Sequence, residues 1–266
     1  MKNKLILLLA AATALIVACA TSPLGRDQLI LFPDEQLDQM GVTAWQQLQE
    51  QTPVDDGRRV NRYVACIAQA VTSELPGAEA GGWEVSVFED DDVNAFALPG
   101  KKIGVYEGLL GVAENQNQLA AVIGHEVAHV VSQHANERVS TAFATQTGLQ
   151  LAQIAAGATT PVQQQLFSLL GLGAQVGIVL PFGRAQEAEA DLIGLDLMAK
   201  AGFDPRSSVE LWQNMAEAGG QQPPEFLSTH PSGASRINNL NARMPHAMEL
   251  YEQARAQGKR PDCGPP

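Results

Sequence analysis

Apolar residues recur at steps of three and four along much of the chain, the spacing of one face of an α-helix. This pattern predicts helices at residues 34–51, 55–75, 117–138, 185–201, 204–218 and 232–256. Residues 83–88 alternate apolar and polar side chains, which indicates a strand, and two more strands are expected at 95–98 and 102–105 around a Pro99-Gly100 turn. The fold class is therefore expected to be α+β, predominantly helical, with a small β-sheet.

The N-terminus has the pattern of a secretory leader. Two lysines precede an apolar run at residues 5–18, which is too short to span a bilayer well. Residues 16–19 (Ile-Val-Ala-Cys) resemble the bacterial lipobox, whose cysteine is lipidated and becomes the first mature residue. An ordinary cleaved signal and an uncleaved anchor are the alternatives. Because a polar stretch follows Cys19, and Ala20 replaces the Asp of an inner-membrane retention signal, we expect a lipoprotein anchored to the outer membrane and facing the periplasm.

The chain is acidic, with 17 Lys and Arg against 29 Asp and Glu and a net charge of −12. This charge disfavours nucleic acid as a partner and contributes nothing to binding at anionic lipid surfaces. Attachment to a membrane would therefore depend on the acyl chains of a lipidated Cys19.

Two cysteines remain beyond Cys19, namely Cys66 and Cys263. An even number in an oxidising compartment favours a disulfide between them. The alternative is a buried free Cys66 and a loose terminal Cys263. Neither lies in a C-x-x-C pair, so the cysteines do not indicate a metal site.

The densest chemical signal is His125-Glu126-Val127-Ala128-His129, inside an apolar helical stretch. Positions four apart on a helix lie on one side, so His125 and His129 can hold one Zn²⁺ together. Glu126 lies beside them, where it can take a proton from a metal-bound water. A chance meeting of these residues is the alternative. However, the chain has only five histidines, and two of them fall at ligand spacing around a glutamate.

A catalytic zinc usually has three protein ligands, so a third must be sought. His134 lies about 140° round the same helix from His129 and cannot reach the metal without a break in the helix. It is expected to face solvent or to support a ligand. A later helix offers Glu187 and Asp191, four apart on one face, of which one can bind metal while the other orients a ligand histidine. Taken alone, such a pair is usually a solvated helix surface.

The two motifs together resemble metallopeptidase family 48, in which H-E-x-x-H is followed by E-x-x-A-D on a later helix. In that register Glu187 is the third ligand, Asp191 orients a histidine and Glu189 is only a neighbour. Residues 94–100, 108–110 and 229–231 are also similar to the periplasmic lipoprotein branch of this family. The resemblance covers residues 60–242 and implies a gluzincin metalloprotease domain with one Zn²⁺ per chain.

The resemblance implies further site residues. An edge strand above the zinc is expected to bind an extended peptide by main-chain hydrogen bonds, and its residues are Asn94, Ala95, Phe96, Ala97 and Leu98. A plain structural hairpin would have the same pattern. His230, with Arg236 as the weaker candidate, is expected to donate to the oxyanion of the reaction. His230 could instead fill the fourth zinc position in a latent state, or simply start a helix beside Pro231. His246 has no partner motif and is expected at the surface.

Residues 141–183 contain no Asp, Glu, Lys, Arg or His. Glycine and proline interrupt this segment too often for one transmembrane helix, so we expect a pair of core or lid helices covering the site. A sharper hypothesis is a mobile apolar lid that meets the membrane or a misfolded client.

These observations predict a zinc-dependent endopeptidase that cleaves misfolded or envelope proteins in the bacterial periplasm. Its partners would be polypeptides, either unfolded proteins or outer-membrane proteins. The main alternative is a periplasmic chaperone or assembly factor for outer-membrane proteins with latent or minor protease activity. A small-molecule metallohydrolase is disfavoured by the expected peptide-binding strand. The expected organisation is a signal peptide at 1–18, a linker and helix at 19–52, the metallopeptidase domain at 53–258 and a tail at 259–266.

Overall fold

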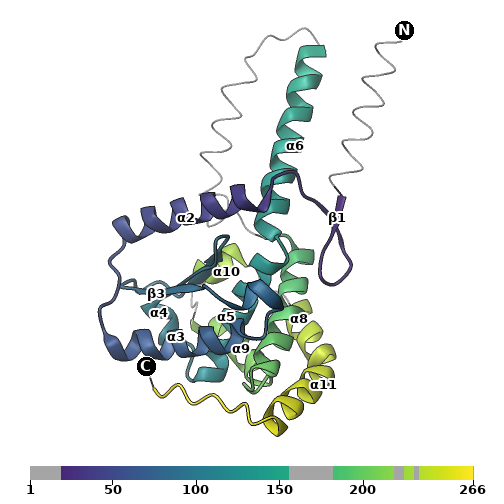
Figure 1. Ribbon diagram of the computed structural model, residues 1–266. Coiled ribbons are helices and arrows are strands. Elements are labelled where there is room, and N and C mark those ends of the chain that lie inside the picture. Colours follow the sequence, from purple (N-terminus) through teal and green to yellow (C-terminus); the bar gives the residue numbers. More distant parts are fainter. Residues whose placement is uncertain (1–18, 156–181, 219–224, 231–233, 266) are drawn as a thin grey trace.

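The computed structural model describes residues 19–155, 182–218, 225–230 and 234–265 (Figure 1). The expected signal peptide, and the part of the expected lid between residues 156 and 181, lie outside the described residues. The helices are α2 (Asp34–Gln51), α3 (Arg58–Thr72), α4 (Glu107–Leu110), α5 (Gln116–Val131), α6 (His134–Ala155), α8 (Arg184–Lys200), α9 (Ser207–Ala218), α10 (Glu225–Thr229) and α11 (Ala234–Ala256), with a 3₁₀ turn at Gly77–Ala80. The strands are β1 (Cys19–Thr21), β2 (Asp27–Leu29), β3 (Glu84–Phe88), β4 (Ala95–Leu98) and β5 (Lys102–Tyr106).

The predominantly helical α+β architecture is confirmed, but some expected boundaries are wrong. Helix α3 starts at Arg58 because the preceding residues pair with β3: Val54 forms a bridge with Phe88, and the N–H of Asp55 donates to the carbonyl of Val87. Helix α9 starts three residues after Asp204, and α10 was not expected. The helix expected at 117–138 is two helices, with the chain turning at Gln133.

The main sheet has the strand order β3-β5-β4. Strands β3 and β5 are parallel, whereas β4 and β5 form the expected antiparallel hairpin. Gly100 and Lys101 both have positive φ, 77° and 60°, which fits a tight turn where glycine relieves strain. Strand β4 is therefore at an edge of this sheet, as predicted.

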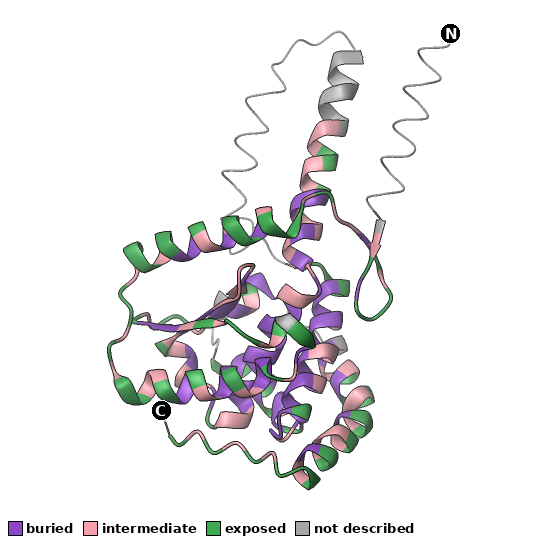
Figure 2. Ribbon diagram, viewed as in Figure 1, coloured by how far each residue is buried: buried purple, intermediate pink, exposed green. Residues whose placement is uncertain are grey.

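Helix α5 is the centre of the main core. It packs against α3, β4, α8 and α9, and the buried residues concentrate on these central helices (Figure 2). Representative core side chains are Ile67, Leu119, Ile123 and Met198, all of them fully buried. A smaller cluster, built on Trp45, Phe88 and Phe96, fills the space between α2 and the sheet. Together these two cores cover both faces of the sheet.

Residues 19–31 were expected to be a polar linker, and that expectation is wrong. Strands β1 and β2 form an antiparallel hairpin that docks beside the junction of α5 and α6. The side chain of Gln28 donates to the carbonyl of Ser132 (2.7 Å), and the N–H of Leu31 donates to Ser140 Oγ (2.9 Å). This N-terminal hairpin is thus an ordered part of the fold.

The C-terminal tail is also held to the body. Cys66 on α3 and Cys263 form a disulfide with their Cα atoms 5.6 Å apart, the pairing expected from the cysteine count. Gln116 accepts the N–H of Cys263 and donates to the carbonyl of Pro261. Among the described residues, no helix combines the length and apolarity needed to cross a membrane.

Helices α5 and α8 approach closely at two glycines. A Cβ atom added at Gly194 would lie 2.6 Å from the backbone nitrogen of His125, and one added at Gly124 would lie 2.7 Å from the carbonyl oxygen of Gly194. These separations are shorter than any normal carbon contact, so larger residues would separate the helices. Glycine at both positions lets α8 lie directly against α5.

Replacing Gly194 with alanine is expected to lower the free energy of unfolding. Forcing a methyl group into such a contact costs about 1–3 kcal/mol, because the helices must shift. Urea unfolding followed by circular dichroism measures the loss. Gly81→Ala is the matched control, since its Cβ would meet nothing within 4 Å. Equal stability of the two variants would contradict a tight glycine contact.

Candidate active site

Helix α5 directs the first motif into the interior. Its N-cap, Asn115, accepts hydrogen bonds from the N–H groups of Asn117 and Gln118, which fixes the start of the helix. His125 and His129 are 2% and 3% exposed, and their Nε2 atoms lie 3.1 Å apart. The four-residue spacing thus brings both imidazoles to one point, as predicted.

Two later segments bring further donors to these nitrogens. Glu187, in the first turn of α8, places Oε1 3.4 Å from His129 Nε2 and Oε2 3.6 Å from His125 Nε2. His230, directly after α10, places Nδ1 3.2 Å from His125 Nε2 and 3.0 Å from Glu187 Oε1. One donor atom from each of these four buried residues lies within 4.8 Å of the others.

This donor set fits a tetrahedral zinc ion. Bonds of about 2.05 Å would place tetrahedral donors about 3.3 Å apart, and the contacts above range from 3.0 to 3.6 Å. Burial lowers the pKa of His129 well below its usual value, which keeps that imidazole neutral. Burial opposes ionisation of Glu187, but hydrogen bonds from His129 and His230 outweigh it and lower the pKa of the carboxyl. Neutral imidazoles and an ionised carboxylate are the forms that bind zinc.

His230 lies where a catalytic zinc usually keeps a water. Its ring is stacked between Phe182 and Phe226, with ring centroids 5.0 and 4.4 Å away. This position corresponds to the fourth-ligand alternative raised from the sequence. The two aromatic rings were not anticipated, although Phe226 lies one helical turn before His230.

Glu126 is buried beside the donor set. Its Oε2 accepts the N–H of Ala97 in β4 (3.3 Å), and its Oε1 lies 3.5 Å from His230 Nε2. Oε1 accepts no hydrogen bond from the described residues. Burial raises the pKa of this carboxyl. A buried carboxyl oxygen without a donor, next to the donor set, is suitably placed to accept a proton.

Asp191 lies against the second nitrogen of His125, with Oδ1 3.1 Å from Nδ1. The Arg236 guanidinium donates to both Asp191 oxygens (2.8 and 2.6 Å), lies 2.8 Å from Glu187 Oε2 and stacks on Trp212. Burial opposes ionisation of Asp191, but the charge of Arg236 and the contacts with His125 lower its pKa. Arg236 therefore holds two carboxylates in place, which removes it as a candidate oxyanion donor.

His134 does not face solvent, and that part of the prediction is wrong. The helix breaks at Gln133, whose φ is 54°, so α6 begins with His134 turned inward. The ring is completely buried, with Nδ1 2.9 Å from His129 Nδ1 and Nε2 3.2 Å from Glu189 Oε2. Burial lowers the pKa of His134 to about 4. Glu189, expected only to neighbour Glu187, also has a structural contact, because its carboxylate lies against His134. His246, by contrast, is exposed as expected.

Strand β4 runs alongside Glu126. Asn94 pairs with Tyr106, and in an antiparallel pair hydrogen-bonded residues alternate along the strand. Ala95 and Ala97 therefore turn their main-chain N–H and C=O groups away from β5. The N–H of Ala97 donates to Glu126, which ties this edge of the strand to α5.

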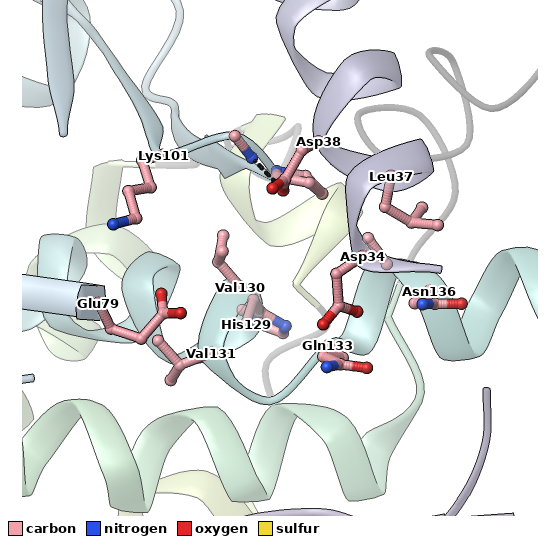
Figure 3. Close-up of a pocket in the computed structure, with 13 residues that line it drawn as sticks. Asp34, Leu37, Asp38, Glu79, Lys101, His129, Val130, Val131, Gln133 and Asn136 are labelled. Atoms are coloured by element: carbon pink, nitrogen blue, oxygen red, sulfur yellow. Dashed lines mark hydrogen bonds between the residues drawn. The ribbon is translucent and has the colours of Figure 1, made fainter. Parts of the chain in front are cut away.

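A pocket of about 200 Å³ lies at the end of this edge strand (Figure 3). It is enclosed by α2, the β4–β5 turn and the junction of α5 and α6, and His129 forms part of its wall. Three acidic side chains line it, namely Asp34, Asp38 and Glu79, together with Lys101. Asp38 is bound to the backbone N–H of Gly100 (2.7 Å), which ties α2 to the turn.

The site defines a class of protein. Two histidine donors from one helix and a glutamate donor from a later helix, with a second glutamate beside the first histidine, are the arrangement of gluzincin metallohydrolases. The chain belongs to peptidase family M48, whose model matches residues 58–244.

Relatives with known names support the same assignment. The chain is 40% identical over 192 residues to the mitochondrial metalloendopeptidase OMA1 of Schizosaccharomyces pombe, covering 71% of this chain and 55% of that protein. It is 30% identical over 252 residues to the human protein of that name, covering 86% and 46%. It is also 27% identical over 226 residues to the beta-barrel assembly-enhancing protease of Escherichia coli, covering 80% and 46%. The chain thus spans about half the length of these relatives.

Replacing Asp191 with asparagine is expected to weaken zinc binding by about 10–100-fold, because His125 loses a carboxylate that orients its ring. Competition with a chromogenic chelator measures the affinity. Asp196→Asn, on the same helix and paired with Arg243 at the surface, is the control. Equal affinity of the two variants would exclude an orienting role for Asp191.

Proposed function

We propose that the chain is a zinc-dependent endopeptidase in which Glu126 is the general base. The single observation that carries this proposal is the buried donor set of His125, His129, Glu187 and His230 with Glu126 directly beside it. A purely structural zinc needs no neighbouring base, so Glu126 favours hydrolysis. When bound, Zn²⁺ would polarise the scissile carbonyl and make a water easier to deprotonate.

The protein side chains supply the remaining steps. Glu126 accepts the proton of the attacking water and returns it to the leaving amine, which requires a carboxyl within hydrogen-bond reach of both. Asp191 orients His125, while Arg236 holds Asp191 and Glu187 in place and its charge helps to keep Asp191 ionised within the core. The burial that raises the pKa of Glu126 also makes it a stronger proton acceptor than a solvated carboxylate.

A polypeptide substrate fits the edge strand best. The outward main-chain groups of Ala95 and the carbonyl of Ala97 can pair with an extended peptide, so Asn94 to Leu98 would bind substrate with little sequence selectivity. A peptide that follows β4 beyond Leu98 reaches the acidic pocket beside His129. Basic side chains should therefore be favoured at that subsite.

The closed donor set indicates a resting state. His230 would be a fourth protein donor to a zinc ion held by His125, His129 and Glu187, so access for a water and a substrate carbonyl would require His230 to move away. His230 follows α10, a helix of five residues in which the N–H of Phe226 donates to the carbonyl of Val93 and the carbonyl of Thr229 accepts the N–H of Phe182. A latent peptidase that opens on substrate binding agrees with this geometry.

We further propose that the enzyme acts on misfolded or outer-membrane proteins in the bacterial periplasm, anchored through a lipidated Cys19. The leader-like residues 1–18 and the name of the assembly-enhancing relative support this role. The closed site also favours a second candidate, an assembly factor or chaperone for outer-membrane proteins that cleaves rarely.

Glu126→Gln separates these functions. The variant should bind zinc like wild type but lose casein cleavage by about 10²–10⁴-fold, because only the base is removed. Zinc content and cleavage are measured on the same preparations, with chelator-treated wild type as the metal-free reference. Undiminished cleavage by Glu126→Gln would rule out the mechanism. An undiminished chaperone activity in this variant would assign that activity to binding alone.

His230→Ala should retain zinc on three ligands and cleave casein faster than wild type, because the fourth position becomes available to water. Cleavage rates and zinc stoichiometry together test this. His246→Ala is the control, since that histidine is exposed. Slower cleavage by His230→Ala would instead assign His230 as the oxyanion donor.

A further inference from the structure

A buried series of hydrogen bonds leads from His129 to the N-terminal hairpin, and the proposed function does not use it. His129 turns Nε2 toward the other donors and Nδ1 toward His134 Nδ1, 2.9 Å away. His134 Nε2 in turn lies 3.2 Å from Glu189 Oε2. His134 is fully buried and Glu189 is 5% exposed. Groups so well buried need partners, so these contacts fix one another.

We propose that His134 and Glu189 are positioning residues for the metal ligand His129, and that the N-terminal hairpin holds Glu189 in place. In this arrangement His134 fixes the ring orientation of His129 and keeps the proton of His129 on Nδ1. The Nε2 atom of His129 then stays unprotonated and is directed toward the zinc position. The inference rests on the metal site of the proposed function.

The positions of the protons follow from the metal site. A histidine that binds zinc through Nε2 carries its proton on Nδ1, so His129 Nδ1–H must donate. His134 Nδ1 is the atom that faces it and must therefore accept. A neutral His134 then carries its proton on Nε2, where the Glu189 carboxylate accepts it. Each contact thus has one donor and one acceptor, and the opposite order would place a proton on the metal-binding nitrogen.

The geometry of α8 explains why an imidazole lies between His129 and the carboxylate. Asp191 is about 40° round the helix from Glu187 and reaches His125 directly, whereas Glu189 is about 200° round and points to the far side. His134, placed by the break between α5 and α6, spans that gap. The two ligand histidines of α5 are therefore supported by two carboxylates of α8, one directly and one through a ring.

The hairpin supplies the remaining partners of Glu189. Ser22 Oγ and the N–H of Leu24 donate to Oε1, and Arg26 Nε donates to Oε2 (3.0 Å). Arg26 is itself held by Glu137 on α6 through two contacts of 2.5 and 2.7 Å. All these groups act on one carboxylate that does not contact the metal donors. Their combined effect is to fix Glu189 in the orientation that His134 requires.

The matched pair His134→Asn and His134→Gln tests the relay. The asparagine oxygen can take the place of Nδ1 and accept from His129, whereas the glutamine amide reaches the Nε2 position and leaves His129 without an acceptor. Zinc affinity of the full chain is measured by chelator competition, with thermal unfolding of the metal-free proteins as the folding check. We expect His134→Asn to lie within about threefold of wild type and His134→Gln to be weaker by about 10–100-fold. His246→Gln is the control for loss of a histidine.

Cobalt-substituted protein gives a second readout. The visible absorption bands of Co²⁺ should shift in His134→Gln, because the His129 ring turns, and should remain near wild type in His134→Asn. Equal zinc affinity and equal spectra for the two folded variants would overturn the proposal. A wild type that binds no zinc would instead overturn the proposed function, so the two failures are distinguishable.

Arg26→Ala tests the contribution of the hairpin. Zinc affinity should fall by about threefold to tenfold, because Glu189 loses a charged partner. Arg243→Ala removes a comparable ion pair with Asp196 away from the site and should leave zinc affinity unchanged. If the two arginine variants have the same affinity, the hairpin does not support the metal site.

Discussion

The structure depends on the close contact between α5 and α8. At Gly124 and Gly194 the two backbones touch, which brings the carboxylates of α8 within reach of the imidazoles of α5. Burying a carboxylate without a partner costs several kcal/mol, so such a contact is stable only if each charge is compensated. Asp191 and Glu187 share Arg236, and Glu189 has Arg26. The helix contact therefore sets the dimensions of the metal site, and the ion pairs make that contact possible.

The parts of the site whose arrangement agrees with the expectation from sequence follow local rules. His125 and His129 are four apart, so helical geometry alone brings them together, and the motif register on α8 identifies Glu187 and Asp191. The edge position of β4 also follows from a short hairpin whose turn is marked by Pro99-Gly100. The pairing of Cys66 with Cys263 needed only the count of cysteines. In each case the prediction needs only the geometry of one helix, the residues of one turn or the number of cysteines.

The parts that were missed depend on a change of chain direction or on distant partners. The residue type of Gln133 does not mark it as the end of a helix, because a left-handed glutamine is uncommon. The sequence therefore left open whether His134 faces solvent or supports a ligand, and the structure agrees with the second alternative. The hairpin at 19–31 has the composition of a linker, because its polar residues have partners that are distant in the sequence, such as Glu137 and Glu189. When both partners of a contact are polar and distant in the sequence, their residue types do not indicate that they are in contact.

The donors differ in which parts of the fold hold them. His125 and Glu187 are fixed by Asp191 and Arg236 inside the core, which can rearrange only if much of the structure unfolds. His230 follows a five-residue helix, and the support of His129 ends in the N-terminal hairpin. Both supports are buried, since the His230 ring is stacked between Phe182 and Phe226 and Glu189 accepts hydrogen bonds from the hairpin, but they come from segments outside the contact of α5 and α8. Cys19, where lipidation is expected, lies three residues before Ser22, so attachment to a membrane would act on the element that supports His129.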